Sequence, residues 1–173
     1  MANKSLLIAN PYDNKHLEMI GKYEHDFSFS NAEVSKNLQI TREKYNEPTY
    51  DEYLKRSNEV EQFLFIEEDS SLTSGCMIDC YKDIKSCYLT LLPAKNERYK
   101  KIMLQAATSY AIKGLGMEEV FINISSSDTR TALTILESGF EDLGEENNTN
   151  IYMMDKDSYF AKEGLLDGNN KKY

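Results

Sequence analysis

Four basic residues gather in one short segment of an acidic chain. Lys95, Arg98, Lys100 and Lys101 follow Pro93 closely, whereas the chain as a whole has a formal net charge of −9. A strand pattern ends at this proline and a helix pattern begins after it. In an open α/β sheet such a junction binds anions, because the helix N-terminus presents unpaired amides. The segment is either an anion site or a solvated first helical turn, and the cost of placing lysines beside a helix N-terminus favours the anion site.

The junction belongs to a strand, a helix and a second strand. Residues 86–92 and 120–124 have the apolar character of strands, and residues 97–113 follow the spacing of an amphipathic helix. A helix that crosses between two strands places them parallel, with a right-handed connection. The predicted anion site therefore lies at the carboxyl end of the first of these strands.

The rest of the chain supplies further elements around this unit. Apolar and alternating runs predict strands at 6–9, 62–66, 74–81, 140–143 and 150–154. Capping and periodicity predict helices at 15–23 behind Asp13 or Asn14, after Ser30 or Asn31, at 50–58 behind Thr49, and from 125–129 to Glu137. We expect an α/β (α+β) fold: a mixed, mostly antiparallel sheet of six to seven strands with a central parallel pair, flanked by helices. We expect one domain over 1–155 and a tail over 156–173 that is partly helical or disordered.

Composition limits the class of protein. The charge of −9 argues against nucleic acid as a partner, because phosphate neutralisation needs a basic face. No apolar run is long enough to cross a bilayer and no signal peptide is recognised, so we expect no membrane partner and a cytoplasmic location. The histidines and scattered acids show no metal-ligand spacing, so we expect no metal site.

The order of elements, together with three motifs, resembles the GNAT-type N-acetyltransferases. The motifs are Leu91-Leu92-Pro93 at the end of the fourth strand, Gly114-Leu115-Gly116 before the strand at 119–124, and Leu136-Glu137-Ser138-Gly139-Phe140. The resemblance implies transfer of an acetyl group to an amine, with acetyl-CoA or another acyl-CoA as cofactor. It also implies a small-molecule or peptide amine as acceptor, with a homodimer as a possible assembly. The pantetheine arm of the cofactor is then expected between strands 86–92 and 120–124.

The sequence departs from the family pattern at the pyrophosphate loop. That loop normally carries glycines, which let backbone amides approach the phosphates closely, but residues 94–103 contain none. The resemblance implies that side-chain charge replaces those contacts. The residues implied to bind the cofactor are Leu91, Leu92, Lys95, Arg98, Tyr99, Lys100, Lys101 and Asp128.

The catalytic groups are also unusual. Ile135 stands where the family often has a tyrosine that protonates the leaving thiolate, and Tyr152 replaces it only if the fold brings it over the site. By position, Glu67 and Tyr88 are the candidates to remove a proton from the amine, with Glu68 and His25 as weaker ones. A backbone N–H near Leu92 is expected to polarise the thioester carbonyl. The alternative is a non-catalytic GNAT-like binding or regulatory domain that has lost acetyl-CoA binding.

Overall fold

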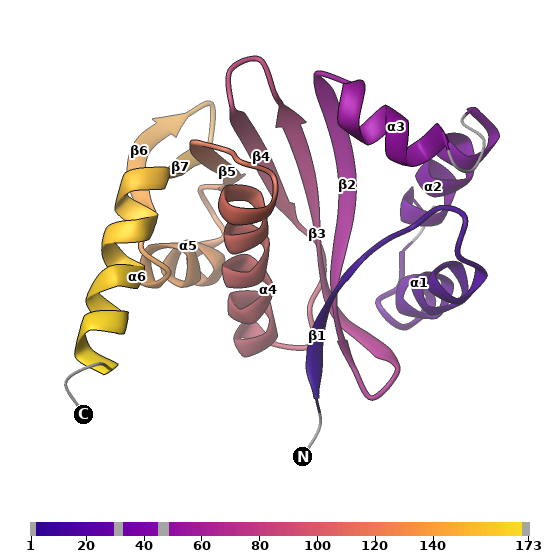
Figure 1. Ribbon diagram of the computed structural model, residues 1–173. Coiled ribbons are helices and arrows are strands. Elements are labelled where there is room, and N and C mark those ends of the chain that lie inside the picture. The colour runs from indigo at the N-terminus through magenta and orange to yellow at the C-terminus, as the bar shows by residue number, and fades with distance from the viewer. Residues whose placement is uncertain (1–2, 30–32, 45–48, 171–173) are drawn as a thin grey trace.

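The computed structural model describes residues 3–29, 33–44 and 49–170, with side chains up to residue 164 (Figure 1). Its strands form one seven-stranded sheet in the order β1-β2-β3-β4-β5-β7-β6. Only β4 and β5 pair in parallel, and every other neighbouring pair is antiparallel. The predicted mixed sheet with a central parallel pair is therefore confirmed. The strands are β1 Lys4–Ile8, β2 Glu59–Glu68, β3 Ser71–Tyr81, β4 Ser86–Leu91, β5 Glu119–Ser125, β6 Glu141–Glu146 and β7 Thr149–Asp155.

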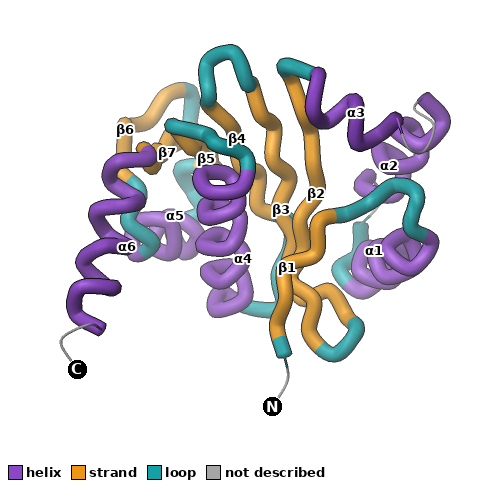
Figure 2. Tube along the Cα trace, in the orientation of Figure 1, coloured by secondary structure: helices purple, strands orange, loops and turns teal. Residues whose placement is uncertain are grey.

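Helices lie on both sides of this sheet (Figures 1 and 2). The helices are α1 Asn14–Asp26, α2 Glu33–Lys44, α3 Thr49–Arg56, α4 Glu97–Ser109, α5 Thr129–Glu137 and α6 Lys156–Asn170. A π-helical turn, η1 Tyr110–Gly114, continues α4 toward β5. Helices α4, α5 and α6 lie on one side, and α1 and α2 lie on the other side over the β1–β3 half. Helix α3 lies beside the first residues of β2, where its Leu54 packs against the cluster on the α4 side.

Two buried clusters hold these layers together. The larger cluster lies between α4 and the central strands and includes Met103, Leu89 and Ile122, all nearly inaccessible to solvent. The smaller cluster joins α1 and α2 to the first strands, with Ile20 and Phe65 at its centre. Alternate residues of a strand face opposite sides of the sheet, which explains how the same strands supply both clusters.

Several predicted boundaries differ from the structure. Strand β2 runs to Glu68, so Glu67 and Glu68 belong to the strand that we expected to end at 66. The turn is formed by Asp69 and Ser70, whose φ angles are 52° and 64°. Asp13 caps α1 as predicted, since its side chain accepts hydrogen bonds from two first-turn amides. Thr49 is the first residue of α3, and the caps expected at 30 or 31 lie outside the described residues.

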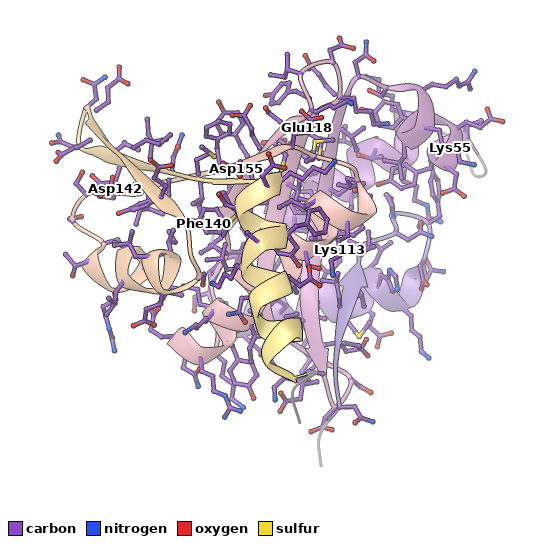
Figure 3. All side chains as sticks on the ribbon, turned by 60° about the vertical axis from the view of Figure 1, so that its left-hand side comes forward. Lys55, Lys113, Glu118, Phe140, Asp142 and Asp155 are labelled. Atoms are coloured by element: carbon purple, nitrogen blue, oxygen red, sulfur yellow. The ribbon has the colours of Figure 1, made fainter. Side chains whose placement is uncertain are left out.

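Helix α6 occupies the segment that we expected to be a partly helical or disordered tail. Lys162 of α6 donates a hydrogen bond to the Ser138 carbonyl at 2.8 Å, and Glu163 pairs with Lys113 at the end of the π-helical turn. Figure 3 shows Lys113 beside α6. These contacts attach α6 to the α4 and α5 side of the sheet. No helix in the described part of the chain is both long and apolar enough to cross a membrane.

Candidate active site

The central parallel strands separate at their carboxyl ends. Pairing between β4 and β5 begins at Ser86 opposite Glu119 and ends at Leu89 opposite Ile122. Beyond that point β4 stays paired with β3 and β5 stays paired with β7, so each strand follows its outer neighbour. The separation leaves a cavity of ≈ 450 Å³ between the strand ends and the N-termini of α4 and α5.

This cavity reaches both faces of the sheet. Leu91 and Ile124 belong to the α4 side, where they pack against the larger cluster. Thr90 and Asn123 also line the cavity, and strand alternation places them on the opposite face. Residues from both faces of the sheet therefore line the same cavity.

One backbone amide of β4 points into the separation. The Leu92 N–H, near which we expected a donor, is already bonded to the Gly75 carbonyl of β3 at 2.9 Å. Because successive amides of a strand point to opposite neighbours, the Leu91 N–H faces β5, beyond the last paired residue. The donor for a ligand in the cavity is thus the amide of Leu91.

Hydrogen bonds fix the backbone of the loop before α4, which contains no glycine. Asn96 caps the helix by accepting a hydrogen bond from the Tyr99 N–H at 3.1 Å, and the Lys95 N–H donates to the Thr73 carbonyl at 2.8 Å. No residue between 93 and 101, all of them described, takes a positive φ. The amides of Glu97 and Arg98 remain in the first turn, where a helix provides no acceptor of its own.

A polar network joins the N-termini of α4 and α5 across the cavity mouth. Lys100 Nζ lies 3.0 Å from Glu97 Oε1 and 2.9 Å from Thr131 Oγ1. The hydroxyl of Thr134 donates to the other Glu97 oxygen at 3.0 Å. Burial by itself raises the pKa of Asp128, but hydrogen bonds from Thr131 and the charge of Lys100 bring it below its ordinary value. The carboxylates here are thus balanced by an ammonium group.

The residues predicted to bind the cofactor divide into those inside and those outside the cavity. Leu91, Leu92, Lys100 and Asp128 line it. Lys95 and Arg98 are exposed at the start of α4, with Lys95 Nζ 5.5 Å from the centre of the Tyr99 ring. Neither Tyr99, whose hydroxyl donates to Glu68 at 2.8 Å, nor Lys101, which pairs with Glu137 at 3.3 Å, lines the cavity.

The candidate bases lie at different distances from the cavity in the sheet. Glu67 pairs with Leu72 on β3 and Ser5 on β1, and it does not line the cavity. Tyr88 lies on β4 two residues before Thr90, on the same face, and its ring stacks on Phe121 with centres 5.3 Å apart. Tyr88 is therefore the nearer candidate.

The other candidate acids and bases have ordinary surroundings. Tyr152 is 1% exposed and accepts a hydrogen bond from Asn150 at 3.1 Å, so its place is in the core. Ile135 is fully buried. His25 lies on the exposed end of α1 beside Asp26. Glu68 accepts a hydrogen bond from the Tyr99 hydroxyl.

Four residues of the cavity carry no motif that marks them in the sequence: Thr90, Glu97, Asn123 and Thr131. The available signal was weak: Asn96 before Glu97 and Asp128 three residues before Thr131 are cap positions, which indicate helix starts. The contacts that give these residues a role run between different elements, so they depend on the fold.

Comparison with known proteins identifies the fold. No protein-family model and no curated protein matches the sequence. The N-acetyltransferase PseH from Campylobacter jejuni matches in structure with a TM-score of 0.61 and 13% identity, covering 88% of this chain and 98% of that one. PseH in complex with acetyl coenzyme A matches with a TM-score of 0.58 and 13% identity over 88% and 99% of the two chains. The dodecameric spermidine N-acetyltransferase from Vibrio cholerae matches with a TM-score of 0.61 and 12% identity, covering 90% of this chain and 95% of that one.

At these identities the likeness establishes the arrangement of the chain and not its chemistry. The structural match covers nearly the whole length of this chain and of each of these proteins. This chain has the fold of the GNAT-type N-acetyltransferases.

Proposed function

We propose that this protein transfers an acyl group from an acyl-CoA, acetyl-CoA in the first instance, to an amine. The observation that carries the proposal is the cavity between β4 and β5, which is lined by residues from both faces of the sheet. It lets the cofactor and the acceptor meet at one point from opposite sides. The same fold holds acetyl coenzyme A in the PseH complex, which supports the choice of cofactor.

The residues around the cavity fit such a cofactor. The separated strand ends offer apolar contacts from Leu91, Leu92 and Ile124, and the Leu91 N–H faces the gap. The first-turn amides of Glu97 and Arg98 and the exposed side chains of Lys95 and Arg98 suit a diphosphate. The Glu97 carboxylate, which by itself repels an anion, is bonded to Lys100 and Thr134. These groups take the place of the missing glycine loop.

The chain's own groups have three tasks in this reaction. The cofactor supplies the activated acyl group. The Leu91 amide would donate to the carbonyl oxygen on which charge develops, and Thr90 and Asn123 would orient the amine at the opposite opening. An amine is protonated at neutral pH and must lose a proton before it attacks. Tyr88, on the acceptor side, and Glu67 stay our candidates for that step, directly or through water.

The acceptor belongs to the proposal as well. We propose a small-molecule or peptide amine, and the spermidine N-acetyltransferase among the structural neighbours supports the small-molecule class. A homodimer is proposed through β6 and β7, because β6 forms one edge of the sheet and its side chains are exposed.

A second function is favoured by two observations. Glu97 places a carboxylate at the helix start where the diphosphate would bind, and Ile135 is buried where the family often has its acid. Both suit a GNAT-like binding or regulatory domain that no longer binds the cofactor.

Two measurements on the full chain distinguish these functions. Calorimetry with acetyl-CoA should detect binding in the micromolar range, and a panel of amines should release free CoA thiol in stoichiometric amounts with acetylated amine. Absence of binding at millimolar acetyl-CoA would contradict the enzyme and support the second function. Binding without transfer to any amine of the panel would support a binding domain that keeps the cofactor.

A further inference from the structure

The face of the sheet opposite α4 carries a row of aromatic side chains beside the cavity. Tyr88 is 40% exposed and Tyr81 is 36% exposed, large values for aromatic residues in the middle of a sheet. Tyr88 stacks on Phe121, and its ring meets Tyr81 edge-on with centres 6.1 Å apart. Helices α1 and α2 pack farther along this face, over Phe63, Phe65 and Leu72. The aromatic row therefore forms an uncovered surface that leads to Thr90 and the cavity.

Two carboxyl groups continue this row. The strand registers place Glu61 opposite Asp79, Asp79 opposite Tyr88, and Tyr88 opposite Phe121, so the four side chains lie side by side on one face. Partial burial, the charge of Asp79 and a hydrogen bond between the two carboxyl groups raise the pKa of Glu61 above its ordinary value. Like charges directly opposite each other destabilise a sheet, so ionisation of both carboxyl groups is unfavourable for folding. A bound cation would offset this repulsion.

The charged residues at the strand positions of this face are all acidic. They are Glu59, Glu61, Glu67, Asp79, Glu119, Glu141, Glu146 and Asp155, and none of the described strands places a lysine or arginine there. Asp155 caps α6 and Glu119 accepts a hydrogen bond from Ser86, whereas Glu61 and Asp79 lie directly opposite each other. Lys44 of α2 and Glu61 line the same cavity, so one basic residue from a helix lies near the pair. A second copy of the chain would bring a second acidic face, so repulsion argues against a dimer through this surface.

The spacing along the sheet sets the length of a matching ligand. Residues rise about 3.3 Å along a strand and strands lie about 4.8 Å apart, which puts the Asp79 backbone about 8 Å and the Glu61 backbone about 12 Å from Thr90. We propose that this surface binds the acceptor, and that the acceptor is a linear aliphatic amine with at least two ammonium groups. Its terminal amine lies at Thr90 and Asn123, its chain lies on Tyr88 and Phe121, and a second ammonium lies between Glu61 and Asp79. This inference rests on the proposed function for the terminal amine, but the binding surface itself can be tested without the reaction.

The test compares two ligands of one length by calorimetry, in the absence of any cofactor. One is diaminooctane with an amine at each end, and the other is amino-octanol, which keeps one amine and replaces the other with a hydroxyl. We expect the diamine to bind the wild-type protein at least tenfold more tightly than the amino alcohol. In the double variant Glu61→Gln/Asp79→Asn this preference should disappear. In the matched variant Glu145→Gln/Glu146→Gln, which removes two charges from exposed β6, the preference should persist.

Each outcome bears either on the second ammonium site or on the proposed transfer reaction. Equal binding of the two ligands by the wild type, or a preference that survives Glu61→Gln/Asp79→Asn, would overturn the second ammonium site. A preference lost equally in both double variants would also overturn it, because net charge alone would then explain binding. Acetyl-CoA is titrated separately into the same preparations. Binding of acetyl-CoA without diamine preference contradicts this inference alone, whereas diamine preference without acetyl-CoA binding contradicts only the proposed transfer reaction.

Discussion

The two sides of the central strands differ in charge although they share the same backbone. On the α4 side, Lys95, Arg98, Lys100 and Lys101 surround the start of one helix. On the opposite face, Glu61 and Asp79 stand next to exposed aromatic rings, with no basic residue at the described strand positions. The formal net charge of −9 conceals this division. An anionic cofactor and a cationic acceptor would each meet the side of opposite charge, and the two would meet at the gap after Leu89.

The largest expected effect lies at the point where the two sides meet. Leu91→Pro removes the N–H that faces the gap, at a position where proline costs no ladder hydrogen bond. Loss of one donor to a developing oxyanion lowers the turnover rate by about 100-fold or more. Stopped assays of CoA release with saturating substrates would measure it.

Leu91→Ala is the matched control for that prediction. It shortens the same side chain but keeps the amide, so turnover should fall far less than in the proline variant. Equal losses in the two variants would assign the effect to the packing of Leu91 in the core and not to its N–H.

The next prediction concerns the basic residues at the start of α4 and the affinity for acetyl-CoA. Lys95→Ala/Arg98→Ala removes the two cations that are exposed at the helix start, and we expect the dissociation constant for acetyl-CoA to rise about tenfold at low salt. Calorimetry at two salt concentrations measures this, and the difference should shrink as salt rises. Lys101→Ala, which breaks only the pair with Glu137, should change affinity little. An equal loss in Lys101→Ala would show that the charges act through the general field of the protein.

A substitution at Glu97 should change the affinity for acetyl-CoA less, and in the opposite direction. Glu97→Gln removes a carboxylate from the first turn and releases Lys100 from its ion pair, so acetyl-CoA should bind about threefold more tightly. Tighter binding would confirm that the carboxylate opposes an anion there. Weaker binding would show that Glu97 is needed to place Lys100.

The smallest effect concerns stability on the acidic side. The folded pKa of Glu61 is raised, so the stability that this carboxyl contributes is full below its unfolded pKa and is lost as the pH rises through its folded pKa. Glu61→Gln does not ionise, so it should melt about 1 °C above the wild type at pH 7, a small shift because the side chain is exposed. Melting curves at pH 7 and at pH 4 would compare the two proteins. Besides Asp79 of β3, the groups that face Glu61 are Lys44 of α2 and Tyr50 and Tyr53 of α3. A gain that persists at pH 4 would point to one of these three and not to repulsion from Asp79.

The sequence was sufficient to predict the order of elements and the junction at 92–101. Its signals there are local: a strand that ends at a proline, a helix period and capping residues. The strand ends were less predictable, because Glu59 and Glu61 interrupt an apolar run and we began that strand at Gln62. The charged ends of β2 are held in the ladder by β3, which a single segment does not reveal.

The site was predictable only in part, since its contacts run between elements. Leu91, Leu92, Lys100 and Asp128 were expected and do line the cavity. The pairing of Lys100 with Glu97, of Lys101 with Glu137 and of Glu61 with Asp79 depends on helix placement and strand register. A difference of one residue in register would move Asp79 to the other face, so no reading of composition could have found that pair.

The most direct test of the two-sided arrangement is to map both ligands on the isotopically labelled protein by amide chemical shifts. Desulfo-CoA, which lacks the reactive sulfur, and diaminooctane would be titrated separately. Our account predicts that desulfo-CoA shifts the amides of Leu91, Glu97 and Arg98, that the diamine shifts those of Glu61, Asp79 and Tyr88, and that the two sets meet at Thr90. Shifts of one shared set by both ligands, or desulfo-CoA shifts away from the gap between β4 and β5, would contradict it.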